Sequence, residues 1–95
     1  MSDSRIFEWD DTKAASNLAK HGIAFDEAIR VFRDPAYVDV DVSRLQDRES
    51  RRKAIGAIQG RLFTVVYTVR SDATRLISAR RCNSPERSLY GSNNS

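Results

Sequence analysis

The residues best suited to chemistry are two adjacent arginines, Arg80 and Arg81, which follow an apolar run over residues 76–79. A guanidinium group is permanently charged and pairs bidentately with phosphate oxygens. At the end of a strand, such groups could stabilise the charge that develops on a phosphate when one of its bonds breaks. Successive side chains of a regular strand alternate between its faces, so only one of the two would point into a given groove. The alternative is a solvated pair that forms salt bridges with Glu86 or Asp72.

Three further side chains are candidates for proton transfer or phosphate binding. Histidine titrates near neutral pH, and the single histidine, His21, lies at the C-terminal end of a predicted helix whose dipole favours a protonated imidazole. It is therefore a candidate acid or phosphate ligand, or else a cap for the helix carbonyls. Lys20 points about 100° away around that helix, so the two are not expected to act on one atom. Glu49 lies between Arg48 and Arg51, where cations keep a carboxylate ionised; it is a candidate weak base, or one half of a solvated salt bridge.

Positive charge is concentrated in the second half of the chain. Residues 1–43 carry nine acidic and five basic side chains, whereas residues 44–81 carry ten basic and three acidic ones, so the formal net charge of +3 conceals a cationic half. A cationic surface built on strands suits a nucleic-acid backbone, and a solvated exterior is the alternative. The candidates for nucleic-acid contacts are Arg51, Arg52, Lys53, Arg61 and Tyr90. The tyrosine could stack on a base or complete the core.

Length and composition disfavour several classes of protein. With 95 residues, 40% of them hydrophobic, the chain can build one modest core. We place it in a single domain over residues 1–90, followed by a disordered tail over residues 91–95. No apolar stretch is long enough to span a membrane, and the first residues do not resemble a secretion signal. We therefore expect a cytoplasmic protein without membrane contact.

Disulfide, thiol and metal chemistry are also disfavoured. The single cysteine, Cys82, excludes an internal disulfide, and only one histidine is present to activate it. Asp39 and Asp41 share one face of a predicted strand and could hold Mg²⁺, but they lie in the acidic half, away from the arginine pair. We expect no metal site and no cofactor.

The periodicity of the apolar residues predicts an α+β fold. Asp10 and Gly22 have the residue types that begin and end a helix, and Asn83 with Glu86 forms a capping box that begins another. The predicted helices cover residues 11–21, 26–33 and 84–90, and the predicted strands cover residues 36–42, 52–58, 62–69 and 74–80. Tight turns join the last three strands. We therefore expect two N-terminal helices, a four-stranded, mainly antiparallel sheet and a short C-terminal helix.

Two blocks of residues near the ends of the chain coincide in type and spacing with a known family. The first is Phe7-Glu8-Trp9-Asp10, then Lys13, Asn17-Leu18, Lys20-His21-Gly22, Phe25 and Ala28. The second is Ile77-Ser78-Ala79-Arg80-Arg81, then Glu86-Arg87 and Tyr90, with Ile55-Gly56 and Gly60-Arg61 between the blocks. Together they resemble the BrnT family of bacterial toxins, from which Cys82-Asn83 and Gly91 depart. The resemblance implies a RelE-like fold and a type II toxin, inhibited by a BrnA-like antitoxin whose ribbon-helix-helix-type domain binds DNA.

The candidate residues and the resemblance together predict an endoribonuclease that inhibits translation and growth. Cleavage of RNA by its own 2′-hydroxyl needs a base, cations for the developing charge and an acid for the leaving 5′-oxygen, and it needs no metal. Arg80 and Arg81 are the expected cations, with His21, Lys20 and Glu49 as further catalytic candidates. The expected partners are RNA and the antitoxin, with promoter DNA bound only through the antitoxin. The alternative is a non-catalytic module that binds nucleic acid or protein.

Overall fold

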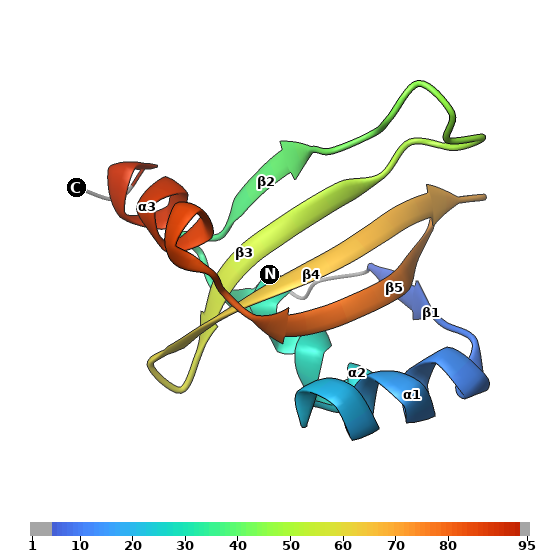
Figure 1. Ribbon diagram of the computed structural model, residues 1–95, viewed down its shortest axis with the longest axis horizontal. Helices are drawn as coiled ribbons and strands as arrows, with labels where there is room; N and C mark the ends of the chain where they lie inside the picture. Colours follow the sequence, from blue (N-terminus) through green and yellow to red (C-terminus); the bar gives the residue numbers. More distant parts are fainter. Residues whose placement is uncertain (1–4, 94–95) are drawn as a thin grey trace.

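Helices cover both faces of a five-stranded mixed sheet (Figure 1). The computed structural model describes residues 5–93 of the chain. The strand order is β1 (Ile6–Glu8), β5 (Ala73–Arg81), β4 (Arg61–Arg70), β3 (Arg52–Ile58) and β2 (Val38–Asp41). β1 runs parallel to β5, and all other neighbouring strands are antiparallel. In Figure 1, α1 (Asp11–His21) and α2 (Phe25–Ala28) lie on one side of the sheet and α3 (Ser84–Asn93) lies on the other.

The α+β class is confirmed, but the predicted four-stranded, mainly antiparallel sheet is wrong, because the N-terminal residues add a fifth, parallel strand. β1 has three residues, which is too short for an alternating pattern to be recognised in the sequence. Its register places Ile6 opposite Ala73, near the other end of the chain. Parallel strands are joined by long crossover connections, so no local turn signal announces such a pair.

The helices after α1 also differ from their predicted bounds. α2 is one short helix that continues as a 3-10 helix, η1 (Ile29–Arg33), instead of a single α-helix over residues 26–33. α3 continues through Asn93, beyond its predicted end near Tyr90, so residues 91–93 of the predicted tail are helical. Residues 94 and 95 of that tail lie outside the described residues. Within residues 5–93, no helix combines the length and apolar character needed to cross a membrane.

Side-chain hydrogen bonds define the start of α1 and join the helix to the sheet. Asp10 accepts from the N–H of Lys13 at 2.9 Å, and Gly22 adopts a φ of 72°, which confirms the predicted ends of the helix. The buried side chain of Asn17 donates to the carbonyl of Ala79 at 2.9 Å and accepts from its N–H at 3.0 Å. β1 pairs with β5 only as far as Arg75. At Ala79, the side-chain amide of Asn17 therefore makes the hydrogen bonds that a neighbouring strand would otherwise make.

The larger core lies between the sheet and the segment formed by α1, α2 and η1. The ring of Phe32 contacts those of Phe7, Tyr37 and Tyr67, with centroid distances of 5.4, 5.6 and 5.2 Å. Gly56 of β3 lies directly against η1, because a Cβ at this position would be 2.9 Å from a carbonyl oxygen of that helix. Only glycine allows the backbone of η1 to approach the sheet this closely.

Candidate active site

The two arginines at the end of β5 lie on opposite faces of the sheet, as the alternation of a regular strand predicts. Arg80 points to the side of α3, where it binds Glu86. Arg81 points to the side of α1 and α2, where its guanidinium lies 5.6 Å from the centroid of the Phe63 ring. The strand irregularity between β4 and β5 is at Val66 and does not reach the arginine pair. The pair therefore cannot act together in one groove.

Arg80 forms part of a network of charges around the fully buried Glu86. Both terminal nitrogens of Arg80 donate to the carboxylate at 2.7 Å, and Lys53 Nζ donates at 2.9 Å. The Asn83 N–H donates to the same carboxylate, and the Asn83 side chain accepts from the Glu86 N–H, which confirms the predicted capping box. The predicted alternative role of Arg80, a salt bridge with Glu86, is therefore observed, and the network fastens the start of α3 to β3 and β5.

The charge network makes the stability of the fold depend on pH. Burial alone would raise the pKa of Glu86, but hydrogen bonds from Arg80, Asn83 and Lys53 lower it from 4.5 to about 2. Because the folded-state pKa is lowered, the stabilisation is complete above pH 4.5 and is lost as the pH falls through about 2. We expect Glu86→Gln to remove this component, on the order of 3 kcal/mol, so that the free energy of unfolding falls less steeply between pH 4.5 and 2. Urea unfolding at several pH values measures the slope. The exposed Glu27→Gln should retain the native slope, and equal slopes in all three proteins would contradict the assignment.

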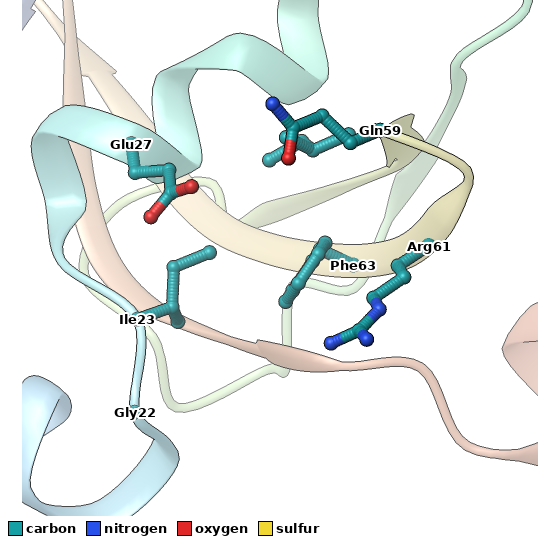
Figure 2. A pocket seen from close by; sticks show the side chains of 7 residues that line it. Gly22, Ile23, Glu27, Gln59, Arg61 and Phe63 are labelled. Carbon is teal, nitrogen blue, oxygen red and sulfur yellow. The ribbon is translucent and has the colours of Figure 1, made fainter.

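Arg81 shares its face with Arg61, beside a cavity of about 440 Å³ at the end of the β3–β4 hairpin. Phe63 lies directly opposite Arg81 in the ladder, and Arg61 precedes it by two residues, so all three side chains are on one face. Figure 2 shows Arg61 and Phe63 along one wall of the cavity and Glu27 on another. Within residues 5–93, neither Arg61 nor Arg81 forms a salt bridge. Two cations without carboxylate partners therefore lie next to one aromatic ring.

Local backbone features explain why the cavity forms at this place. On one side, α1 ends at Gly22 in a left-handed conformation, which turns the chain so that Ile23 and then α2, carrying Glu27, line the wall. On the other side, the turn at Gln59 and Gly60 has φ values of 50° and 80°, which confirms the predicted tight turn. Sequence reasoning missed the roles of Glu27, Gln59 and Phe63 as lining residues. Each occupies an ordinary helix, turn or strand position, and only the packing of two distant segments brings them together.

His21 and Lys20 line a separate, smaller cavity of about 230 Å³ between α1 and the middle of β5. Its other walls include Ile77 and Ser78. His21 immediately precedes Gly22, which lines the larger cavity, so the end of α1 separates the two cavities. The predicted place of His21 at the C-terminal end of a helix is confirmed, and its catalytic role stays a prediction.

Glu49 is not brought near either arginine of the pair. Arg70 donates to both of its carboxylate oxygens, at 2.8 and 2.9 Å, and these hydrogen bonds lower the pKa of Glu49. Arg70 lies six residues along β4 from Thr64, the partner of Arg80, which corresponds to roughly 20 Å of strand. The two groups therefore cannot act on the same atom.

The remaining candidates for nucleic-acid contacts are mostly engaged within the protein. Arg52 forms a salt bridge of 2.7 Å with Asp39, which also accepts from Tyr67. The hydroxyl of Tyr90 donates to Asp34 at 2.7 Å, and this hydrogen bond raises the pKa of Tyr90. Arg51 instead lines a cavity of about 410 Å³ in the loop before β3, where its buried Nε has no hydrogen-bond partner in the described part of the chain.

The residues considered for thiol and metal chemistry have partners within the fold. Burial raises the pKa of the Cys82 thiol, which lies 3.1 Å from the Thr64 hydroxyl. Asp39 is bound by Arg52, and Asp41 accepts from the N–H of Ser43 at 2.8 Å. Among the residues that the structure describes, no three His, Cys, Asp or Glu side chains are close enough together to hold a metal ion.

A comparison with protein families decides between the general classes of function. The chain matches the model of a family described as the ribonuclease toxin, BrnT, of a type II toxin–antitoxin system, over residues 9–86. The chain belongs to the BrnT family. A search of curated proteins found no match.

The BrnT match extends over most of the structure described above. It includes the residues that line the larger cavity, among them Glu27 and Arg61, as well as Arg81 beside that cavity, and it ends at the buried Glu86. Tyr90 lies beyond it. Membership confirms the resemblance seen in the sequence, and it makes the chain a ribonuclease toxin of a type II system, which acts together with an antitoxin.

Proposed function

We propose that this protein cleaves RNA internally, without a metal ion, in the larger cavity between α2 and the β3–β4 hairpin. The observation that carries the proposal is that Arg61 and Arg81 share one face of the sheet with Phe63, beside a cavity that Glu27 lines on another wall. Figure 2 shows Arg61, Phe63 and Glu27 around this cavity. The cavity thus supplies cations, an aromatic face and a carboxylate. Membership of a ribonuclease family supports RNA as the substrate.

In the proposed reaction, the 2′-hydroxyl oxygen of one nucleotide attacks its own 3′-phosphorus. Glu27 accepts the hydroxyl proton, the new O–P bond forms, and the bond from phosphorus to the 5′-oxygen breaks. Arg61 and Arg81 stabilise the additional negative charge on the phosphate oxygens, and a base of the RNA stacks on Phe63. We assign the proton for the leaving 5′-oxygen to His21, which lines the neighbouring cavity and immediately precedes Gly22 at the edge of the larger one. The products are a 2′,3′-cyclic phosphate and a 5′-hydroxyl end.

The other predicted site residues take supporting roles in this proposal. Arg80 and Lys53 hold α3 on the sheet through their salt bridges with Glu86. Because Glu86 neutralises only one of the two cations, they also add positive charge near the end of β5. The proposed antitoxin is BrnA-like and binds promoter DNA through a separate domain. It would inhibit the toxin by covering the cationic cavity with acidic side chains, since complementary charges speed association and fix its register. The proposed place of action is the cytoplasm.

Cleavage of RNA in EDTA tests the proposal directly. We expect the purified protein, separated from its antitoxin, to cut an RNA oligonucleotide in the presence of EDTA and to leave 2′,3′-cyclic phosphate and 5′-hydroxyl ends. The matched DNA oligonucleotide should remain intact, because it has no 2′-hydroxyl. End-labelling and mass spectrometry of the fragments identify the ends. An absolute requirement for Mg²⁺, or equal cleavage of DNA, would contradict this mechanism.

A further inference from the structure

A second cavity, of about 340 Å³, adjoins the proposed cleavage cavity and carries two more arginines. Arg30 and Arg33 of η1 line it. Ile58 and Gln59, at the end of the β3–β4 hairpin, line both this cavity and the larger one. Figure 2 shows the side chain of Gln59 at the rim of the larger cavity, next to the helical segment. The two cavities are therefore neighbours, and the turn of the β3–β4 hairpin lies between them.

The two arginines are available to an anion. Residues three apart in a 3-10 helix lie nearly above one another, so Arg30 and Arg33 project on the same side of η1. Neither forms a salt bridge among residues 5–93. The one carboxylate in the cavity wall, Asp34, already accepts from the N–H groups of Ala36 and Ala57 and from a tyrosine hydroxyl, at 2.9, 2.8 and 2.7 Å. The wall therefore has an excess of positive charge.

We propose that Arg30 and Arg33 form a subsite for a backbone phosphate of the RNA, next to the nucleotide that is cleaved. The proposal rests on the proposed function, because it assumes that the larger cavity holds the scissile phosphate. An RNA strand that leaves this cavity past Gln59 reaches the two guanidinium groups directly. The side-chain amide of Gln59 can donate to the sugar–phosphate backbone of the RNA. Contacts to the backbone carry no sequence information, so this subsite contributes affinity and register but does not recognise bases.

Salt-dependent binding of an uncleavable RNA tests the subsite. A 2′-O-methyl oligonucleotide cannot undergo the attack, so its affinity reports binding alone. Each phosphate contact in a single strand contributes about 0.7 to the slope of log K against log salt concentration. We expect the double variant Arg30→Gln/Arg33→Gln to lower the slope by about 0.7, because the two arginines together hold one phosphate. The matched control, Arg48→Gln, removes one exposed cation from the loop before β3, outside both cavities, and should retain the native slope.

Substrate length separates a failure of this inference from a failure of the proposed function. A dinucleotide fills only the cleavage cavity, so the double variant should cut it at the native rate and lose efficiency only on longer RNA. The single exposed variant Arg33→Gln repeats the test if the double variant does not fold. A native salt slope in the variants, with native cleavage of RNA by the unaltered protein, would overturn the subsite and leave the function standing. Slower association with the antitoxin, without any effect on RNA binding, would likewise overturn it and assign the surface to the protein partner.

Discussion

Replacing Arg80 with Ala should lower the free energy of unfolding by about 3 kcal/mol at neutral pH. The variant leaves the fully buried Glu86 without its bidentate partner, and removal of one member of a buried pair costs roughly 3–5 kcal/mol. We expect a value at the lower end, because Lys53 still binds the carboxylate. For a domain of this size, the loss corresponds to a decrease of about 12–24 °C in the melting temperature. Thermal and urea unfolding measure both quantities.

The neighbouring arginine supplies the control for this experiment. Arg81 is exposed, and its guanidinium lies 5.6 Å from the centroid of the Phe63 ring, so Arg81→Ala should cost less than about 1 kcal/mol. Equal losses of unfolding free energy in the two variants would show that stability does not depend on which face of β5 carries the arginine. Such a result would contradict the structural role of Arg80. The two arginines, both expected as catalytic cations from the sequence, therefore have different surroundings in the structure.

Replacing Arg61 with Ala should lower the rate of RNA cleavage by 10²–10³ while the melting temperature stays close to native. Loss of one donor to a developing negative charge costs about this factor, whereas removal of an exposed side chain usually changes stability by less than about 0.5 kcal/mol. Single-turnover cleavage of an RNA oligonucleotide in EDTA measures the rate, and growth after induction measures toxicity in cells.

Two further variants separate charge from geometry at this position. Arg61→Lys keeps the positive charge but loses the planar fork, so it should retain RNA binding and still cleave slowly. Arg48→Ala removes an equivalent exposed cation from the loop before β3 and should cleave at the native rate. Native cleavage by Arg61→Ala would show that the reaction takes place outside the larger cavity.

Local signals in the sequence were sufficient to predict most of the secondary structure. The Asp10 cap, the left-handed Gly22, the turn at Gln59 and the capping box at Glu86 all form between residues close in sequence, and each was found where it was predicted. The parallel pairing of β1 could not be predicted, because its partner is near the other end of the chain. The change from α-helix to 3-10 helix after Ala28 was also missed, since both conformations bury residues at similar spacing.

The candidate site was less accessible to sequence reasoning than the fold. Alternation along β5 predicted that Arg80 and Arg81 would separate, but it did not indicate which of them meets a buried carboxylate. Charge counts favoured the second half of the chain, whereas Glu27 and the two arginines of η1 come from the acidic half. A surface combines residues from distant segments, so its charge does not follow the balance along the sequence.

The close contact between Gly56 and η1 fixes the position of the arginines of η1 relative to the β3–β4 hairpin. η1 carries Arg30 and Arg33, and it rests on the backbone of β3 at a position where a methyl group would meet a carbonyl oxygen at 2.9 Å. The strand beneath it leads directly to the hairpin that bears Gln59 and Arg61. A side chain at position 56 would push η1 away from β3 and so would change the separation between the two arginine sites. In the proposed complex, Gly56 would therefore fix the distance between the two bound phosphates of the RNA.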